Sequence, residues 1–405
     1  MTFIPEAMGD KGLIIPLARN ISRLRTQLAY AKRWAFYSRY YFKPTPVLSN
    51  GGGESFDLPP IVDELSGQTY LDGRHCCYQQ GGLVHLENAV IASYEFSGCF
   101  GAWPIPLISV QGRGFTAEPQ LTSSRAAMVF GRPKTVPIMT KTRAIAGEAF
   151  HLLGPFQSNW YHTLIDQLSL VARWKSLGLR RRGVRLIMPE LWAGRWSELP
   201  QLIGVADSEI VWFGIEPIEV ERLLLPVGIR VRSTSHTPMA EVAQTFANPD
   251  DIRGLRQLLL AQLEGSFGTR WRRVVIDRSD AWRQPRTQHF HVLADALTTR
   301  YGFERVVMGE LRPSEQLKVF RDSVIVVAEH GAGLASFVAA SKETIIVEVL
   351  PRYWQEVQGH SFNFIARCLG HRAYHTVIDA PISALLLYVE KLIDQAGEPY
   401  TKPVA

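Results

Sequence analysis

The residues best suited to chemistry follow an apolar segment late in the chain. Val324–Val327 is a β-branched run that predicts a buried strand, and His330-Gly331-Ala332-Gly333 comes shortly after it. Where a strand turns at glycines into a helix, backbone N–H groups at the helix start can bind phosphate. His330 stands where the strand ends, at the edge where open α/β sheets bind ligands. We predict a phosphate site here, although a turn that needs glycine for backbone reasons alone would look the same.

A second group, Asn159, His162 and Asp166, has the spacing of one helix face. Gly154-Pro155 ends the preceding strand, and Ser158 or Asn159 can cap the helix that follows. The opposite face is apolar, so we expect it to anchor the helix while the histidine and the carboxylate point outwards. A histidine beside a carboxylate is the pair that a general base needs. An ordinary solvated helix face is the alternative.

Two further features could bind a ligand. Arg278, Arg283 and Arg286 follow an apolar strand segment, and arginines at a strand end can hold a diphosphate through bidentate hydrogen bonds. Surface arginines without a ligand are the alternative. Glu348 lies inside another apolar segment, and a buried carboxylate requires a partner. We expect that partner to be an arginine or a ribose diol.

The elements that must position these residues alternate between strand and helix, which indicates parallel sheets. Short strands are expected near residues 83–86 and 89–91, after a linker at about 50–60. The first alternating series has strands at 144–153, 184–188, 209–212 and 222–225, with helices at 160–177 and near 196–203. The second has strands at 273–276, 304–308, 324–327 and 344–349, with helices at 251–263, 292–301, 314–320 and 334–340. A last helix is expected at 384–393.

Composition narrows the class of protein. The 405 residues are 46% apolar and 20% charged, which suits two folded domains. The four cysteines lack Cys-x-x-Cys spacing, so we expect no structural zinc and a reducing compartment. We find no apolar run long enough to span a bilayer and no signal-peptide pattern, and so predict a protein that is neither secreted nor membrane-spanning.

The basic excess lies near the N-terminus. Residues 11–43 contain lysines and arginines interleaved with aromatic residues but no Asp or Glu, and the whole chain has a formal net charge of +6. Such a segment suits the surface of an anionic membrane. A helix docked on the protein body with a solvated basic face, a transit peptide and a nucleic-acid contact are the alternatives.

Taken together, the motifs resemble those of glycosyltransferase family 61. They are Gly154–Leu168 with Asn159-x-x-His162, Arg278-Ser279 with Arg286 downstream, Glu315-Gln316, His330-Gly331-Ala332-Gly333 and Val347-Glu348. The resemblance covers about residues 144–351 and rests on the order and spacing of the motifs. It implies a GT-B-like α/β fold in which two doubly wound, Rossmann-like domains face a cleft, with an N-terminal helical and β extension.

The resemblance also implies a division of the chain and of the work. The expected parts are a basic segment at 1–50, an acceptor-side domain at 51–235, a nucleotide-sugar domain at 240–380, and a C-terminal helix and tail at 381–405. His330, Gly331, Ala332 and Gly333 would hold the donor diphosphate, Arg278 and Arg286 would neutralise the leaving group, and Glu348 would approach the nucleoside or sugar hydroxyls. His162 or Asp166 would deprotonate the acceptor, and Asn159, Arg283, Glu315 and Ser336 would line the cleft.

The implied activity is inverting sugar transfer from a nucleotide-sugar, with a UDP-sugar expected, to a glycan or lipid-linked glycan hydroxyl, without an obligatory metal or other cofactor. We expect it in capsule or other surface-polysaccharide biosynthesis, in the cytoplasm or at the inner membrane face. Gln288-His289 and Ser336 depart from the Asn-Glu and Asn of the family, which bears on the donor. A non-catalytic nucleotide-binding subunit and a nucleic-acid-binding protein are the alternatives.

Overall fold

A computed structural model describes residues 53–116, 142–233 and 361–396 with short internal gaps, and residues 246–263, 270–279 and 290–351 continuously. The basic segment at 11–43 lies outside the described residues. So do Arg283, Arg286 and the Gln288-His289 departure.

The C-terminal half is built on a parallel sheet, as the second alternating series predicts. Its strands are β14 (Arg272–Asp277), β15 (Glu304–Val307), β16 (Ser323–Glu329), β17 (Ile345–Leu350) and β18 (Tyr374–Ile378), in the order β15-β14-β16-β17-β18. The direction of strand addition reverses between β14 and β16. Ligands of such sheets bind beyond the carboxyl ends of the strands at this reversal.

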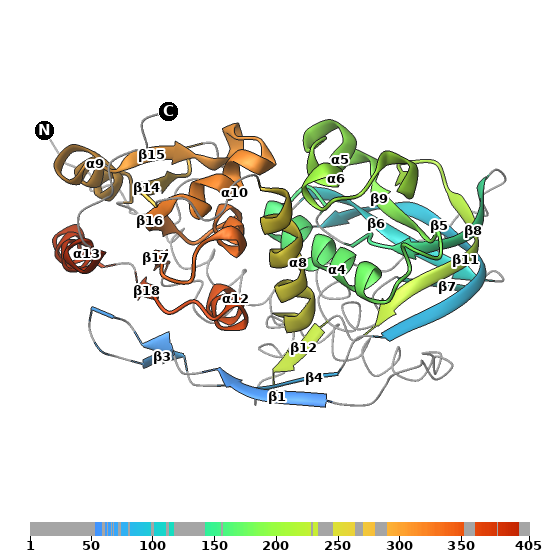
Figure 1. Cartoon of the computed structure of the whole chain (residues 1–405), viewed down its shortest axis with the longest axis horizontal. Coiled ribbons are helices and arrows are strands. Elements are labelled where there is room, and N and C mark those ends of the chain that lie inside the picture. Colours follow the sequence, from blue (N-terminus) through green and yellow to red (C-terminus); the bar gives the residue numbers. More distant parts are fainter. Residues whose placement is uncertain are drawn as a thin grey trace, which may run out of the picture.

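Helices cover both faces of this sheet (Figure 1). One face packs on α9 (Phe290–Tyr301) and α13 (Ile382–Ala396), and the other on α10 (Pro313–Arg321), η5 (Ala332–Ala339) and α12 (Ser361–Leu369). The helix expected at 334–340 is present as a 3₁₀-helix. Its side chains from Leu334 to Ala339 are all buried, so tight packing rather than helix propensity sets its form.

The N-terminal sheet is mixed: its parallel strands suit the expected Rossmann-like domain, and antiparallel strands extend it on one side. Its strands are β5 (Gly82–Gly98), β6 (Gly101–Val110), β7 (Arg113–Thr116), β8 (Arg143–His151), β9 (Arg185–Pro189), β10 (Ile210–Phe213) and β11 (Ile218–Val227). They lie in the order β10-β9-β8-β11-β5-β6-β7 across the sheet. The strands β8 to β11 pair in parallel as predicted, but β5 joins β11 antiparallel and extends the sheet through β6 and β7. The two short strands expected near residues 83–91 are one long strand, β5.

Smaller strands complete this half of the chain. One sheet joins β1 (Gly53–Leu58), β4 (Arg74–Gln79), β12 (Arg230–Ser233) and β13 (Phe246–Ala247), and β2 (Ile61–Val62) pairs with β3 (Thr69–Leu71). Among the helices, η2 (His162–Leu168) runs into α4 (Ser169–Ser176). The helix expected near 196–203 is replaced by α5 (Glu190–Arg195) and α6 (Leu199–Leu202), with η3 (Asp207–Glu209) after them.

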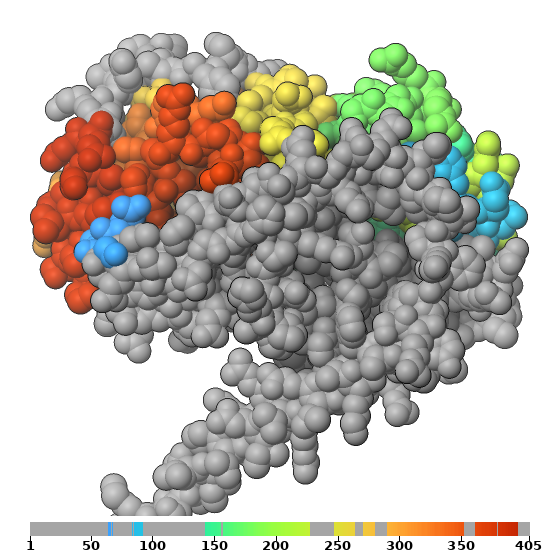
Figure 2. Space-filling model, turned by 90° about the horizontal axis from the view of Figure 1, so that it is seen from below, coloured from blue at the N-terminus to red at the C-terminus, as the bar shows by residue number. Residues whose placement is uncertain are grey.

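Each of the two large sheets and its helices forms a lobe of the molecule. A layer of helices centred on α8 (Pro249–Gln262) joins the N-terminal lobe to the C-terminal lobe (Figure 1). Figure 2 shows this yellow segment between the green N-terminal lobe and the orange-to-red C-terminal lobe. Arg173 of α4 and Asp251 of α8 form a bidentate ion pair in which both side chains are buried. Arg256 of α8 donates to the Val338 carbonyl of η5 at 2.8 Å. One apolar core therefore runs through both lobes.

The α4–α8 crossing depends on a glycine. A Cβ placed at Gly254 would lie 2.5 Å from the Cβ of Ala172, too close for any real contact. We expect Gly254→Ala to lower the melting temperature because overpacking costs about 1–3 kcal/mol, which outweighs the gain in helix propensity. Adding Ala172→Gly should restore most of the loss, since the swap moves the single Cβ to the other helix. A Gly254→Ala protein as stable as the wild type would contradict this account.

His371, after α12, is expected to make the fold acid-sensitive. Burial, with a contribution from the positive charge of Arg256, lowers its pKa to about 4. Between that value and the ordinary histidine pKa of about 6.5 the unfolded chain binds the extra proton. The free energy of unfolding should therefore be fully retained above pH 6.5 and fall as the pH drops towards 4. In His371→Gln this slope, measured by urea unfolding, should be shallower by up to about 1.4 kcal/mol per pH unit. An unchanged slope would contradict the assignment.

Candidate functional site

The segment after β8 is fixed in place before the helix begins. The Gln157 carbonyl accepts hydrogen bonds from Trp192 Nε1 at 2.9 Å and Thr163 Oγ1 at 3.0 Å. Asn159 Oδ1 accepts from the Tyr161 backbone N–H at 3.0 Å, so Asn159 serves as the predicted cap. These contacts fix the start of the helix and so the position of His162, which follows Tyr161.

His162 and Asp166 contact each other directly. His162 Nδ1 lies 2.6 Å from Asp166 Oδ2, and the side chains are 22% and 7% exposed. Asp166 therefore does not point outwards as expected, because residues 163–168 are all buried. The helix is π-helical at this point, a form that is often found at functional sites. In the tautomer that carries its proton on Nδ1, His162 donates this N–H to Asp166. Nε2 is then the basic nitrogen of the ring.

On the C-terminal sheet, Arg278 and His330 follow two neighbouring parallel strands, β14 and β16. Arg278 Nη1 donates to the His330 carbonyl at 2.7 Å and lies 3.4 Å from Glu329 Oε2. Gly331 allows this approach, since a Cβ there would lie 3.0 Å from Arg278 Nη1. The Arg278 side chain remains 18% exposed. The Arg278 guanidinium thus lies at the carboxyl ends of β14 and β16, where the strand order reverses.

Behind this edge lies a buried polar chain from three strand segments. His330 Nδ1 hydrogen bonds to Glu348 Oε1, and Tyr374 donates its hydroxyl to Glu348 Oε2 at 2.8 Å. Glu348 is fully buried, so its partners are this histidine and tyrosine rather than the arginine or ribose diol expected. Burial, and then the charge of Glu348, raise the pKa of Tyr374 well above its usual value, which keeps the phenol a donor. Glu348 therefore fixes the orientation of the His330 ring through Nδ1.

Aromatic rings connect the two histidine groups. Tyr161 packs edge-on against His162 and against Phe362, with ring centroids 5.3 and 5.5 Å apart. Phe362 in turn contacts the His330 ring at 5.1 Å. Trp160 Nε1 donates to Ser336 Oγ at 2.8 Å, which joins the start of the helix to η5. The His162–Asp166 dyad of one lobe and the carboxyl ends of β14 and β16 in the other are therefore joined by these contacts.

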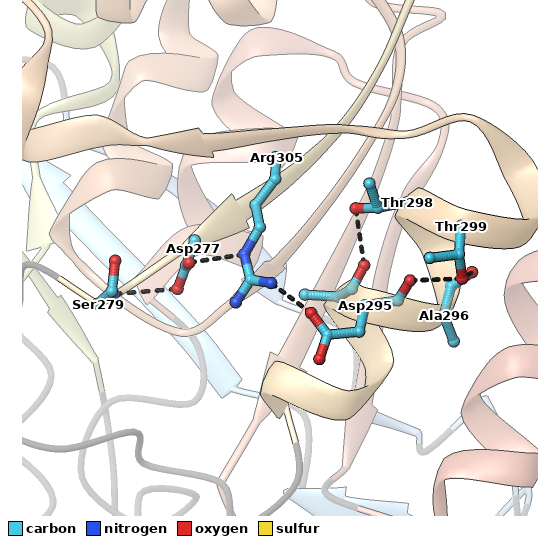
Figure 3. A network of polar contacts seen from close by, with 8 residues as sticks. Asp277, Ser279, Asp295, Ala296, Thr298, Thr299 and Arg305 are labelled. Carbon is cyan, nitrogen blue, oxygen red and sulfur yellow. Dashed lines mark hydrogen bonds and ion pairs between the residues drawn. The ribbon is translucent and has the colours of Figure 1, made fainter.

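An ionic network supports the turn that carries Arg278 (Figure 3). Asp277 accepts from the Ser279 backbone N–H at 3.0 Å and from Arg305 Nε at 2.7 Å. Arg305 Nη1 also donates to Asp295 of α9. These carboxylates raise the pKa of Arg305, and the hydrogen bond that it donates to Asp277 is the main cause.

Residues 160–347 match the model of the family named Glycosyltransferase 61. Over these residues the chain is similar to glycosyltransferase family 61. The match begins at the residue before the Tyr161-His162 pair and ends one residue before Glu348, and so includes the dyad, Arg278 and the glycine turn. No curated protein matches the chain.

Two other predicted site residues, Glu315 and Ser336, make structural contacts. Glu315 caps α10 through the Arg312 backbone N–H at 2.9 Å and pairs with the Arg312 side chain, so it stabilises a helix end. Ser336 is fully buried and accepts from Trp160, which gives this departure from the family pattern a structural role. Among the described residues, no group of three or more His, Cys, Asp or Glu side chains could hold a metal, and no helix is long and apolar enough to cross a membrane.

Sequence reasoning missed several contributors to this site. Tyr374 begins β18 and Phe362 lies on α12, and neither element was predicted. The β-branched residues Thr376, Val377 and Ile378 were an available signal for the strand. The pairing of Asp277 with Arg305 had no signal, because it joins strands that are neighbours only in the folded sheet.

Proposed function

We propose that this protein is an inverting glycosyltransferase. It would move a sugar from a nucleotide-sugar, a UDP-sugar in our proposal, to a hydroxyl of a glycan or lipid-linked glycan acceptor. The observation that carries the proposal is the placement of the His162–Asp166 pair beside the β14–β16 edge, joined through Tyr161 and Phe362. A base for the acceptor and a cation for the leaving group are the two requirements of such a transfer.

The chemistry follows from these positions. His162 Nε2 accepts the proton of the acceptor hydroxyl as that oxygen attacks the anomeric carbon, and Asp166 stabilises the resulting imidazolium. The bond from the anomeric carbon to the phosphate oxygen breaks at the same time, on the opposite face, so the configuration inverts. The nucleoside diphosphate leaves with the electron pair of that bond. Such positioned proton transfer contributes about 10²–10⁴-fold to rate.

On the donor side, Arg278 would neutralise charge on the diphosphate, helped by the backbone N–H groups of the turn at Gly331–Gly333. Arg286, which the resemblance assigns to the same task, lies outside the described residues. His330 and Glu348 act in this proposal by fixing the turn, since both side chains are buried. Arginine and backbone donors can replace a divalent cation here, so we propose a reaction without an obligatory metal.

We place this activity in surface-polysaccharide assembly at the cytoplasmic side of a membrane, with residues 11–43 as a contact to anionic lipid. The basic and aromatic composition of that segment supports the membrane contact. Removal of residues 1–50 should then abolish sedimentation with vesicles that contain phosphatidylglycerol, while nucleotide binding is retained.

The donor site can be tested by thermal stabilisation with UDP, GDP, CDP, CMP and NAD. A ligand at 100 times its dissociation constant adds about 2.7 kcal/mol, which shifts the melting temperature by several degrees. We expect a selective shift with one nucleoside diphosphate, UDP, and a smaller shift in Arg278→Ala. No shift with any of the five would contradict the proposal. Binding without turnover of the matching nucleotide-sugar would instead indicate a non-catalytic subunit.

A further inference from the structure

Asp277 uses both carboxylate oxygens to fix the residue that follows it. Its Oδ1 accepts from the Ser279 backbone N–H at 3.0 Å, and its Oδ2 accepts from Arg305 Nε at 2.7 Å (Figure 3). The backbone of Arg278 therefore lies inside a closed turn between residues 277 and 279. The Arg278 side chain reaches the other way, to the His330 carbonyl.

Arg305 joins this turn to two other elements. It lies on β15, its neighbour Asp277 ends β14, and its second partner Asp295 lies on α9. A guanidinium is planar and presents donors in fixed directions, so one side chain can hold both carboxylates at once. A lysine could reach one of them but could not bridge the two in the same way.

The same pair of strands carries a second ion pair for comparison. Arg272 and Glu304, at the amino ends of β14 and β15, form a bidentate pair at 2.9 and 2.6 Å. It joins the same strands but lies at the edge opposite Arg278. Exposed ion pairs contribute little to global stability. A loss of ligand affinity that follows removal of Arg305 but not removal of Arg272 can therefore be assigned to the turn at residues 277–279.

We infer that Arg305 is a positioning residue for the donor diphosphate. Arg305 holds Asp277, Asp277 closes the turn around Arg278, and the fixed turn directs the Arg278 guanidinium to the β14–β16 edge. Asp295 holds Arg305 from α9. This inference rests on the proposed function, in which Arg278 binds the leaving group.

The test compares Arg305→Met with Arg272→Met in the full-length protein. Binding of UDP and of inorganic pyrophosphate is measured by calorimetry, and melting temperatures are recorded for both variants. We expect Arg305→Met to weaken both ligands about tenfold, the size of one lost hydrogen bond to a charged group. Arg272→Met should bind as the wild type does, with a similar change in melting temperature. Arg305→Lys should recover part of the affinity.

Two variants of Asp277 separate the turn from the bridge. Asn keeps an oxygen that can accept from Ser279, but it loses the charge that holds Arg305. Ala loses both contacts. We expect Asp277→Asn to bind UDP more weakly than the wild type and Asp277→Ala to bind it more weakly still. With nucleotide-sugar, Arg305→Met should raise KM and also lower kcat, because Arg278 neutralises charge on the leaving diphosphate as well as binding it.

The outcomes distinguish this inference from the proposed function. If the wild type binds neither UDP nor pyrophosphate, the donor-site proposal is wrong and the inference falls with it. If the wild type binds and Arg278→Ala loses affinity, but Arg305→Met binds like Arg272→Met, only the positioning role is wrong. A tenfold loss in Arg305→Met that Arg272→Met does not share supports both.

Discussion

Replacing His162 by alanine is expected to slow sugar transfer by about 10²–10⁴-fold and to leave nucleoside diphosphate affinity unchanged. The loss arises because no group remains to take the proton of the acceptor hydroxyl. Donor affinity is spared because the diphosphate contacts belong to the other lobe, where Arg278 follows β14. Turnover is measured as nucleoside diphosphate release, and affinity is measured by calorimetry on the same preparation.

Asp166→Asn provides the companion variant. The carboxylate that accepts from His162 Nδ1 at 2.6 Å becomes an amide, which can donate to that nitrogen and favour the wrong tautomer. We expect a loss of about 10²-fold or more with the fold intact. His375→Gln is a matched control, because His375 also has a hydrogen-bond partner, Tyr388 at 2.9 Å, but lies on β18. If His162→Ala turns over as fast as His375→Gln, His162 is not the base.

Replacing Arg278 by alanine should weaken nucleoside diphosphate binding by about 10- to 150-fold. This is the effect of removing a charge-assisted hydrogen bond worth about 1.5–3 kcal/mol. The side chain is held against the His330 carbonyl and remains partly exposed, as a ligand contact requires. Calorimetry with UDP and with inorganic pyrophosphate should show a similar loss for both ligands, because the contact is to phosphate.

The affinity that Arg278 contributes should depend on the paired N–H donors of its guanidinium group. Arg278→Lys keeps the charge but loses the bidentate geometry, so we expect an affinity between those of the wild type and the alanine variant. Loss of salt dependence should accompany loss of affinity, since an ionic contact is screened by salt. Wild-type affinity in Arg278→Ala would remove Arg278 from the donor site.

The central strands β16 and β17 of the C-terminal sheet could be predicted from sequence because they are buried almost throughout. Segments such as Val324–Val327 are continuous apolar runs, which identify strands without knowledge of their neighbours. The position of the glycine turn after β16 followed from the same pattern. The mixed sheet could not be predicted in this way, because antiparallel pairing of β5 with β11 depends on contacts between distant segments.

The candidate site shows the same division. His162 and Asp166 are four residues apart, so helical spacing was enough to predict their contact. The π-helical form and the burial of Asp166 depend on packing between the lobes. The partner of Glu348 depended on β18, and Tyr374 lies 26 residues further along the chain. Spacing predicts local pairs, whereas the buried chain behind Arg278 exists only once the parallel strands are aligned.

The most direct test of the account follows the anomeric proton of the sugar released from the nucleotide-sugar that the stabilisation panel identifies. With water as the acceptor, NMR spectra taken before mutarotation report the configuration of the first product. We predict the inverted anomer from the wild type, and its formation should be at least about 10²-fold slower in His162→Ala. A product with retained configuration, or one formed equally fast without His162, would contradict direct displacement assisted by this base.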